Sequence, residues 1–295
     1  MIAAITLTPR ISREKTSVPI SIIPATPIIG AEITGVDLAH PLDDETFEAV
    51  RKALVKHSVI VFPNQSLTPE EQIDFSRRFG PLTVHVLKDA LLDGHPEIYR
   101  LSNVKKGGKV QGRSYAGQYW HSDLTYELNP SMGSVLYGIE VPDCGGDTLF
   151  ASTAHAFETL SDPMKTMLEG LTAEHLFSHA FRGGTSPSAR KGDPLNERPA
   201  VEHPVVRIHP ESGRKCLFVN EGFTTRIKCM TPAESKIILS FLHAHTTRSE
   251  VVYRHKWRNG DVVVWDNRSS VHRGVGDYGD VERRHMHRTT IEDAA

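Results

Sequence analysis

The spacing of hydrophobic positions predicts a few amphipathic helices set among many short strands. From Asp43 to His57 apolar residues recur every three to four positions, the period of a helix with one buried face. Two more helices begin with a capping box, in which a hydroxyl residue precedes proline and a glutamate follows three positions after the hydroxyl. These boxes start at Thr68 and Thr231, and we expect the helices to run to Gly80 and to about His245. A shorter helix is expected over 161–169.

The strand-like segments are rich in β-branched residues and are bounded by turn-forming ones. The clearest is Ser58–Phe62, which Pro63 ends, and others are expected at 205–209, 216–220, 251–255, 261–265 and 285–291. We find no internal repeat and no linker, so we expect one domain over 19–295 after a flexible arm at 1–18. The fold class is mainly β with flanking helices, which favours a double-stranded β-helix (jelly roll).

Between Phe181 and His203 the chain is rich in glycine, proline, serine and charged residues, without apolar periodicity. A stretch of this length inside a compact domain is either disordered or a functional lid, and we expect it to close on substrate.

Composition and charge exclude several functional classes. With 39% hydrophobic and 24% charged residues, the chain is typical of a globular enzyme, and its net charge of −2 indicates neither nucleic acid nor a membrane as a partner. No apolar run approaches the roughly 20 residues that span a bilayer. The three scattered cysteines fit a reducing compartment, and the start of the chain lacks a signal-peptide pattern, so the cytoplasm is expected.

His121 and Asp123 stand two residues apart and would point to the same side of an extended chain. His272 follows a strongly apolar strand. Two histidines and a carboxylate occupy one face of an octahedron and leave three positions open, which is typical of non-haem Fe(II) oxygenases. The same set also binds zinc, and a chain with 16 histidines contains many chance pairs, so this spacing alone is a weak motif.

Arg284 and Arg288 would lie on one face of a strand, about 13 Å apart. Buried guanidinium groups need anions, and their fork matches carboxylates and sulfonates; a solvated basic strand is the alternative. The glycine pair 145–146 predicts a tight turn, and Thr148 beside it offers a hydroxyl.

At this point the residues resemble the taurine dioxygenase family, which includes the 2,4-dichlorophenoxyacetate dioxygenases. These enzymes depend on Fe(II) and 2-oxoglutarate. The likeness runs from about Ile22 to Thr290. It is carried by IGAEITGVDL near the start, SRRFGPL at 76–82, WHSD at 120–123, GGDTLF at 145–150, HPVVRIHPESGRK at 203–215, NEGFTTRI at 220–227, and WDNRSSVHR with RRHMHRTT near the end.

The resemblance implies a role for each matching residue. The Fe(II) ligands would be His121, Asp123 and His272, and O2 would be the oxidant. Thr148 and Arg284 would bind the distal carboxylate of 2-oxoglutarate. The implied substrate residues are His85 and Arg288 for the anion, Phe181 and Phe223 as aromatic walls, Trp265 beside the iron, and Lys88 as a further candidate for attracting the substrate acid.

Two departures bear on the substrate. Lys88 stands where the family has a pocket tyrosine, and Gly117 stands where an asparagine is expected. The segment Asn103–Gln118 and RHKW at 254–257 are closer to the phenoxyacetate group, whereas NEGFTTRI is closer to the taurine group.

We therefore expect an Fe(II)/2-oxoglutarate dioxygenase that hydroxylates the carbon next to the heteroatom of a small anionic substrate. Taurine or a related sulfonate, releasing sulfite and an aldehyde, is the first expectation. Aryloxyalkanoates (phenoxy acids) and alkyl sulfate esters are the alternatives within the class. A zinc-binding jelly-roll hydrolase or binding protein is the alternative from another class. Family relatives are often homo-oligomers, so a dimer or larger assembly is expected.

Overall fold

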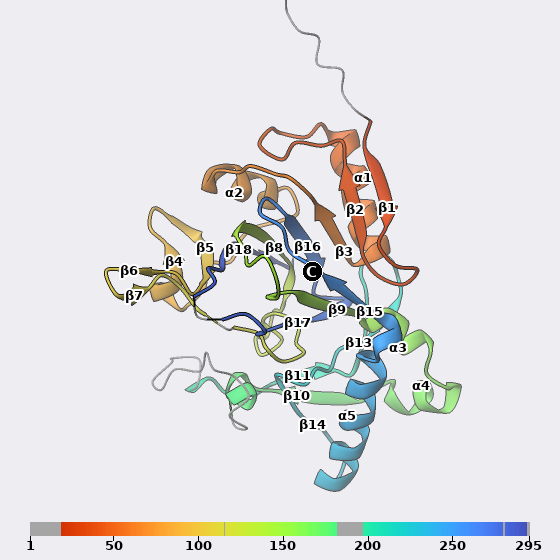
Figure 1. Ribbon diagram of the computed structural model, residues 1–295. Coiled ribbons are helices and arrows are strands. Elements are labelled where there is room, and N and C mark those ends of the chain that lie inside the picture. The colour runs from red at the N-terminus through yellow and green to blue at the C-terminus, as the bar shows by residue number, and fades with distance from the viewer. Residues whose placement is uncertain (1–18, 115, 182–196, 280, 294–295) are drawn as a thin grey trace, which may run out of the picture.

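The computed structural model describes residues 19–293 apart from 115, 182–196 and 280, and the side chains of residues 109 and 181 are also outside the description (Figure 1). The predicted arm at 1–18 and most of the predicted lid therefore lie outside the described residues. The first elements in the chain are β1 (Ser21–Pro24), β2 (Ala31–Thr34), α1 (Asp44–His57), β3 (Val59–Phe62) and α2 (Pro69–Arg77).

Local capping explains where these helices start. The Asp43 side chain accepts a hydrogen bond from the Thr46 backbone and begins α1, and Thr68 forms the predicted capping box of α2. Two predicted boundaries were wrong. Ser58 has a φ of 60° and ends α1, so β3 starts one residue later than expected. The second helix already ends at Arg77, before Gly80.

The middle of the chain forms a run of short elements: η1 (Lys88–Ala90), β4 (Leu91–Leu92), β5 (His95–Ser102), β6 (Lys105–Lys106), β7 (Lys109–Val110), β8 (Ser131–Glu140), β9 (Thr148–Ser152), α3 (Thr153–Glu158), α4 (Asp162–Leu168), β10 (Thr172–His175) and η2 (Phe177–Phe181). The remaining elements are β11 (Val201–Pro204), β12 (Val206–Ile208), β13 (Lys215–Leu217), β14 (Thr224–Ile227), α5 (Pro232–Thr246), η4 (Ser249–Val251), β15 (Val252–His255), β16 (Val262–Asp266), β17 (Ser270–Gly274) and β18 (His285–Glu292). The five strands predicted after residue 204 each begin within one residue of the expected start, and the capping box at Thr231 opens α5.

The major sheet has the strand order β1-β2-β3-β16-β8-β18-β5-β4. Alternate residues of its central strands belong to two different cores, as side chains of a strand alternate between faces. On β16, Val262 and Val264 pack with α1 and α2, whereas Val263 and Trp265 face the interior with Phe150 of β9. The outer face of the sheet is therefore covered by helices, as Figure 1 shows.

The second sheet, β15-β9-β17, supplies Phe150 to the same interior core and so packs against the inner face of the major sheet. Two facing sheets, antiparallel except for the parallel pair β2 and β3, with helices outside confirm the expected mainly β, jelly-roll fold. A third layer of β10, β11, β14 and α5 lies on the other side of the small sheet in Figure 1 and has its own core. Part of the segment predicted as a lid belongs to this layer, because β11 begins at Val201.

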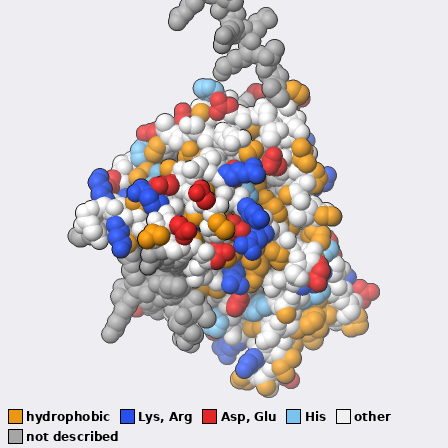
Figure 2. All heavy atoms as spheres, viewed as in Figure 1, with side chains coloured by type: hydrophobic (Ala, Val, Ile, Leu, Met, Phe, Trp, Pro, Cys, Tyr) orange, Lys and Arg blue, Asp and Glu red, His pale blue; other side chains and the backbone are white. Residues whose placement is uncertain are grey.

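Charged side chains of both signs are interspersed on the face drawn in Figure 2, in keeping with the small net charge. Within the described part of the chain, no helix combines the length and the apolar character needed to cross a membrane.

Candidate active site

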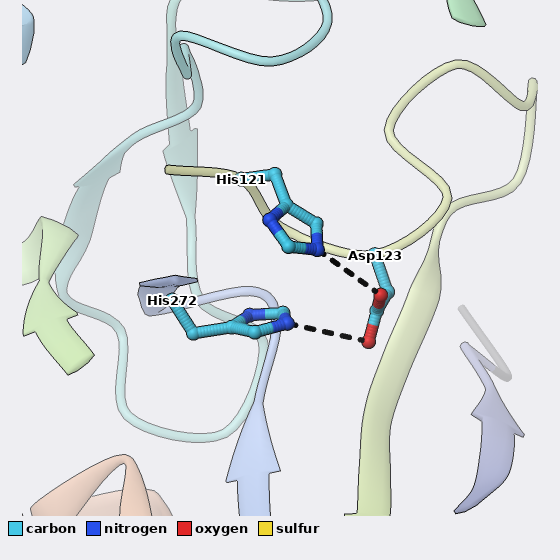
Figure 3. A group of neighbouring side chains, drawn as sticks. All are labelled: His121, Asp123 and His272. Carbon is cyan, nitrogen blue, oxygen red and sulfur yellow. Dashed lines mark ion pairs between the residues drawn. The ribbon is translucent and has the colours of Figure 1, made fainter. Parts of the chain in front are cut away.

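His121 and His272 are brought together by strand pairing. They are partners in an antiparallel bridge, with His121 N donating to His272 O at 2.9 Å and His272 N donating to His121 O at 2.7 Å. Residues directly opposite in such a bridge have neighbouring side chains on the same face. Asp123 follows where the chain turns away, and both imidazoles point toward its carboxylate (Figure 3). The His Nε2 to carboxylate O distances are 3.8 Å for His121 and 3.9 Å for His272.

The protonation of this cluster fits a divalent metal. Burial lowers the pKa of both histidines, so both imidazoles are neutral, as metal ligands must be. Burial opposes ionisation of Asp123, but the charge of Arg288, helped by the hydrogen bond from Ser134, favours the carboxylate, and the pKa of that carboxyl group is lowered. The Nδ1 of His121 lies 2.8 Å from the Tyr119 carbonyl, which leaves Nε2 for a metal. Two neutral imidazoles and one carboxylate, all buried, form a donor set that fits Fe(II).

Neighbouring side chains orient the Asp123 carboxylate. Ser134 Oγ donates to Oδ2 at 2.8 Å, and Arg288 Nη1 donates to Oδ1 at 2.9 Å. The side chain of Asn267 accepts both the backbone N–H of Asp123 and the indole N–H of Trp265. The Trp265 ring in turn lies 4.7 Å from the His272 ring, centroid to centroid. The indole that was expected beside the metal therefore contacts the surroundings of two of the candidate ligands, Asp123 and His272.

Gly117, where the family resemblance led us to expect an asparagine, has a steric reason to be glycine. Its φ is +70°, and a Cβ there would lie 2.8 Å from Cε1 of His121. The imidazole thus occupies the space that a side chain would need. Gly222 also lies close to the segment that carries His121, because a Cβ at Gly222 would be 2.4 Å from the Tyr119 ring.

Arg284 and Thr148 line one side of the same cavity. Desolvation lowers the pKa of Arg284, and among the described residues no carboxylate forms an ion pair with its guanidinium. Its Nε donates to the Gly146 carbonyl at 3.3 Å. Thr148 accepts a hydrogen bond from the Trp257 indole. A cation without an anionic partner beside a hydroxyl is a suitable place for a carboxylate.

A network of ion pairs holds the glycine turn that contacts Arg284. Gly145 and Gly146 have φ values of +85° and +68°, and Gly146 N donates to Asp277 at 2.8 Å. Arg254 bridges the turn from outside, with Nε 2.5 Å from Asp147 Oδ2 and Nη2 3.4 Å from Asp277 Oδ2. The sequence predicts a tight turn at this glycine pair; both glycines have the left-handed backbone conformation that many turns use, and this network borders them.

Arg288 and His85 lie at another side of the cavity, together with Tyr99. Tyr99 is the cross-strand partner of Arg288, so both side chains emerge on one face. Burial, and next the charge of Arg288, lowers the pKa of His85 to about 3, so His85 is neutral. Its Nδ1 accepts from the Leu87 backbone at 3.1 Å, which places the ring proton on Nε2 and makes that atom a donor.

Aromatic side chains that the sequence reasoning did not single out form much of the wall. Tyr119 and Tyr126 pack edge-on against Phe223, and Phe177 stacks on Phe223 at a centroid distance of 6.3 Å. Tyr119 could have been found from its position two residues before His121 on an extended segment. Phe177 and Tyr126 gave no such signal, because they reach the wall through a long-range contact.

The residues that the structure brings around this one cavity are His85, His121, Asp123, Thr148, Phe223, Trp265, His272, Arg284 and Arg288. Arg113 and Trp257 are further residues of the region that sequence reasoning missed. The placement expected for Lys88 was wrong, because Lys88 begins η1, is exposed and does not line the cavity. Phe181 ends η2, and its side chain lies outside the description.

Residues 21–290 match the model of the family described as "Taurine catabolism dioxygenase TauD, TfdA family". The chain belongs to this family. It is 36% identical over 284 residues to an alpha-ketoglutarate-dependent 2,4-dichlorophenoxyacetate dioxygenase of Cupriavidus pinatubonensis, covering 92% of this chain and 97% of that protein. It is 34% identical to an alpha-ketoglutarate-dependent sulfate ester dioxygenase of Pseudomonas putida, over 89% and 86% of the two chains.

A solved structure of a taurine dioxygenase from Burkholderia xenovorans superposes with a TM-score of 0.77 at 36% identity, covering 92% of this chain and 90% of that one. The chain is thus an oxidoreductase of the TauD/TfdA family that uses Fe(II), 2-oxoglutarate (alpha-ketoglutarate) and O2. This result selects the dioxygenase over the zinc-binding hydrolase considered from the sequence.

Proposed function

We propose that this dioxygenase hydroxylates, next to a heteroatom, a carbon of a small organic monoanion whose body is uncharged and apolar. One observation carries the proposal. The cavity beside the metal residues combines aromatic walls with the cations Arg113, Arg284 and Arg288, and the only carboxylate among its described lining residues is that of Asp123. A pocket of this composition stabilises one anionic group and an apolar remainder.

In this proposal each group of residues has a separate task. His121, Asp123 and His272 hold Fe(II), which supplies the oxidant for C–H hydroxylation when 2-oxoglutarate and O2 are also bound. Arg284 and Thr148 bind the distal carboxylate of 2-oxoglutarate. Arg288 and the Nε2–H of His85 bind the substrate anion and orient its reacting carbon. The aromatic walls exclude water around that carbon.

Taurine, the substrate expected first from the sequence, fits this pocket less well than an apolar anion. Its ammonium group needs a carboxylate or carbonyl acceptor when it leaves water. Asp123 is already engaged by Ser134 and Arg288. Lys88, which stands where a pocket tyrosine was expected, is exposed and is not among the residues that line the cavity. We therefore rank aryloxyalkanoates first, because aromatic rings gain from edge and offset contacts with the walls, and alkyl sulfates or alkyl sulfonates second.

The proposed hydroxylation would lead to cleavage of the bond between the hydroxylated carbon and its heteroatom. Hydroxylation of a carbon that bears an ether, sulfate or sulfonate group forms an unstable adduct. This adduct collapses to a carbonyl compound and releases an alcohol, sulfate or sulfite.

A substrate panel tests the proposal. Purified enzyme in aerated buffer with Fe(II), 2-oxoglutarate and ascorbate is given phenoxyacetate, 2-phenoxypropionate, a medium-chain alkyl sulfate, a medium-chain alkyl sulfonate or taurine, and substrate-dependent succinate formation is measured. The Asp123→Asn variant is the inactive control. We expect the phenoxy acids to have the highest kcat/KM and taurine the lowest. Turnover of taurine above every apolar anion would contradict the proposal.

A further inference from the structure

Trp257 forms a buried hydrogen bond with the hydroxyl of Thr148. Its indole Nε1 lies 3.0 Å from Thr148 Oγ1, and the two residues are only 7% and 4% exposed. We propose that Trp257 is a positioning residue that fixes the Thr148 hydroxyl as a hydrogen-bond donor toward the distal carboxylate of 2-oxoglutarate. This inference rests on the proposed role of Thr148 and Arg284 in binding that carboxylate.

The direction of the bond follows from the chemistry of the two groups. An indole N–H only donates, whereas a threonine hydroxyl has one proton and two lone pairs. Once Trp257 has donated to the hydroxyl oxygen, the proton of Thr148 is directed toward another acceptor. A carboxylate only accepts, and the bond to it is charge-assisted. Burial keeps water from competing for either group.

Rigid neighbours hold both partners in place. Thr148 is paired on both sides of β9, with His255 of β15 and with Gly274 of β17. The Trp257 ring packs edge-on against His255 at a centroid distance of 4.7 Å. Its other side lies so close to Gly138 that a Cβ there would be 3.2 Å from the ring. The indole N–H therefore cannot turn toward another acceptor unless β15, which carries His255, and β8, which carries Gly138, also move.

The position of Arg284 completes the arrangement. Arg284 and Thr148 line the same cavity, and the Arg284 guanidinium has no carboxylate partner among the described residues. An anion held there would receive a charged donor from Arg284 and a second donor from Thr148. Without the indole, the hydroxyl could rotate and present a lone pair to the carboxylate, which would repel it.

A double-mutant cycle tests this role through binding. The dissociation constant of 2-oxoglutarate is measured by calorimetry, without O2 and with Mn(II) in place of iron, for the wild type, Trp257→Phe, Thr148→Val and the double variant. We expect Trp257→Phe to weaken binding about tenfold, as loss of a hydrogen bond to a charged group does. In the Thr148→Val background the same change should alter the constant less than about twofold.

Matched controls separate positioning from packing. Tyr253→Phe removes a nearby hydrogen bond, the one between Tyr253 Oη and His255 Nδ1, without touching Thr148, and should leave the 2-oxoglutarate constant unchanged. Thr148→Ser retains the hydroxyl, so in this background Trp257→Phe should again weaken 2-oxoglutarate binding about tenfold, as it does in the wild type. An equal effect of Trp257→Phe in both backgrounds, or no effect in the wild type, would overturn the inference. If Thr148→Val itself leaves binding unchanged, the proposed 2-oxoglutarate site is wrong instead.

A second measurement applies if Trp257→Phe does not fold. With Zn(II) as a diamagnetic metal and 15N-labelled tryptophan, 2-oxoglutarate should shift the Trp257 indole signal in the wild type and in Thr148→Ser. The signal should stay in place in Thr148→Val. An indole signal that 2-oxoglutarate leaves in place in the wild type would also overturn the inference.

Discussion

Arg288 Nη1 donates to Asp123 Oδ1 at 2.9 Å, so the guanidinium proposed to bind substrate also contacts a candidate metal ligand. Arg288 Nε is buried without a hydrogen-bond partner in the described part of the protein, so the group has donors left for a substrate anion. The charge of Arg288 helps to keep Asp123 ionised. The Arg288 side chain thereby connects the candidate metal site with the proposed substrate site.

Replacing Arg288 should affect the substrate more than the co-substrate. For Arg288→Gln we expect KM for the best panel substrate to rise at least about tenfold, as for loss of a charge-assisted pair. The dissociation constant of 2-oxoglutarate should change less than about threefold, because Arg284 is a separate cation. Arg283→Gln is the control, since Arg283 is exposed and pairs with Glu140 at 2.7 Å. Equal losses for both ligands would contradict the role assigned to Arg288.

A methyl group at Gly117 should disturb the metal site. In Gly117→Ala the new Cβ would meet His121 Cε1 at 2.8 Å, so the imidazole must shift. We expect metal affinity, measured by titration with Mn(II), to fall at least about tenfold, in line with the effect of misoriented ligands. Gly213→Ala is a matched control, because Gly213 has a similar φ of +69° but open space around it. Equal metal affinities in the two variants would show that the contact with His121 is unimportant.

The ion pairs around the glycine turn should influence 2-oxoglutarate binding from outside the cavity. Arg254→Gln leaves the buried Asp147 without its partner and loosens the turn whose Gly146 carbonyl contacts Arg284. We expect KM for 2-oxoglutarate to rise several-fold, about 1 kcal/mol of binding free energy, with little change in substrate KM. Arg226→Gln, which breaks a surface pair with Glu174, is the comparison. A loss of thermal stability without any change in KM would assign Arg254 a structural role only.

Acid should destabilise the fold through buried histidines. His175 is fully buried, and burial lowers its pKa to about 3, so the folded state keeps it neutral while the unfolded state binds a proton below about pH 6.5. The contribution of His175 is therefore complete above pH 6.5 and is lost as the pH falls toward 3, at up to about 1.4 kcal/mol per pH unit.

Urea unfolding between pH 5 and 7 measures this effect. His175→Gln should show a shallower loss of unfolding free energy with acid than the wild type. His40→Gln, at a histidine whose side chain is 63% exposed, should follow the wild-type curve. The same slope in all three proteins would rule out His175 as a source of the acid sensitivity.

Much of the fold could be predicted because it depends on neighbours in the chain. The starts of α1, α2 and α5 follow from the caps at Asp43, Thr68 and Thr231, which act within one helical turn. The two-residue period of a strand predicted that Arg284 and Arg288 point the same way, and both line the cavity, although Arg284 directly precedes β18. The family motifs in the sequence also indicated the three candidate metal ligands at 121, 123 and 272, which the structure brings together.

The tertiary structure decided what depends on contacts between distant segments. The bridge between His121 and His272, the aromatic wall around Phe223 and the bond from Trp257 to Thr148 each join residues far apart in the chain. The spacing of residues along the chain does not predict such partners, because they come together only when the strands pair and the sheets pack. For the same reason Lys88 was assigned to the pocket from its place in a motif, whereas the turn into η1 leaves it in solvent. Sequence alone indicated the candidate metal ligands and the arginines, because they belong to local motifs, and the packed sheets determined which residues face one another.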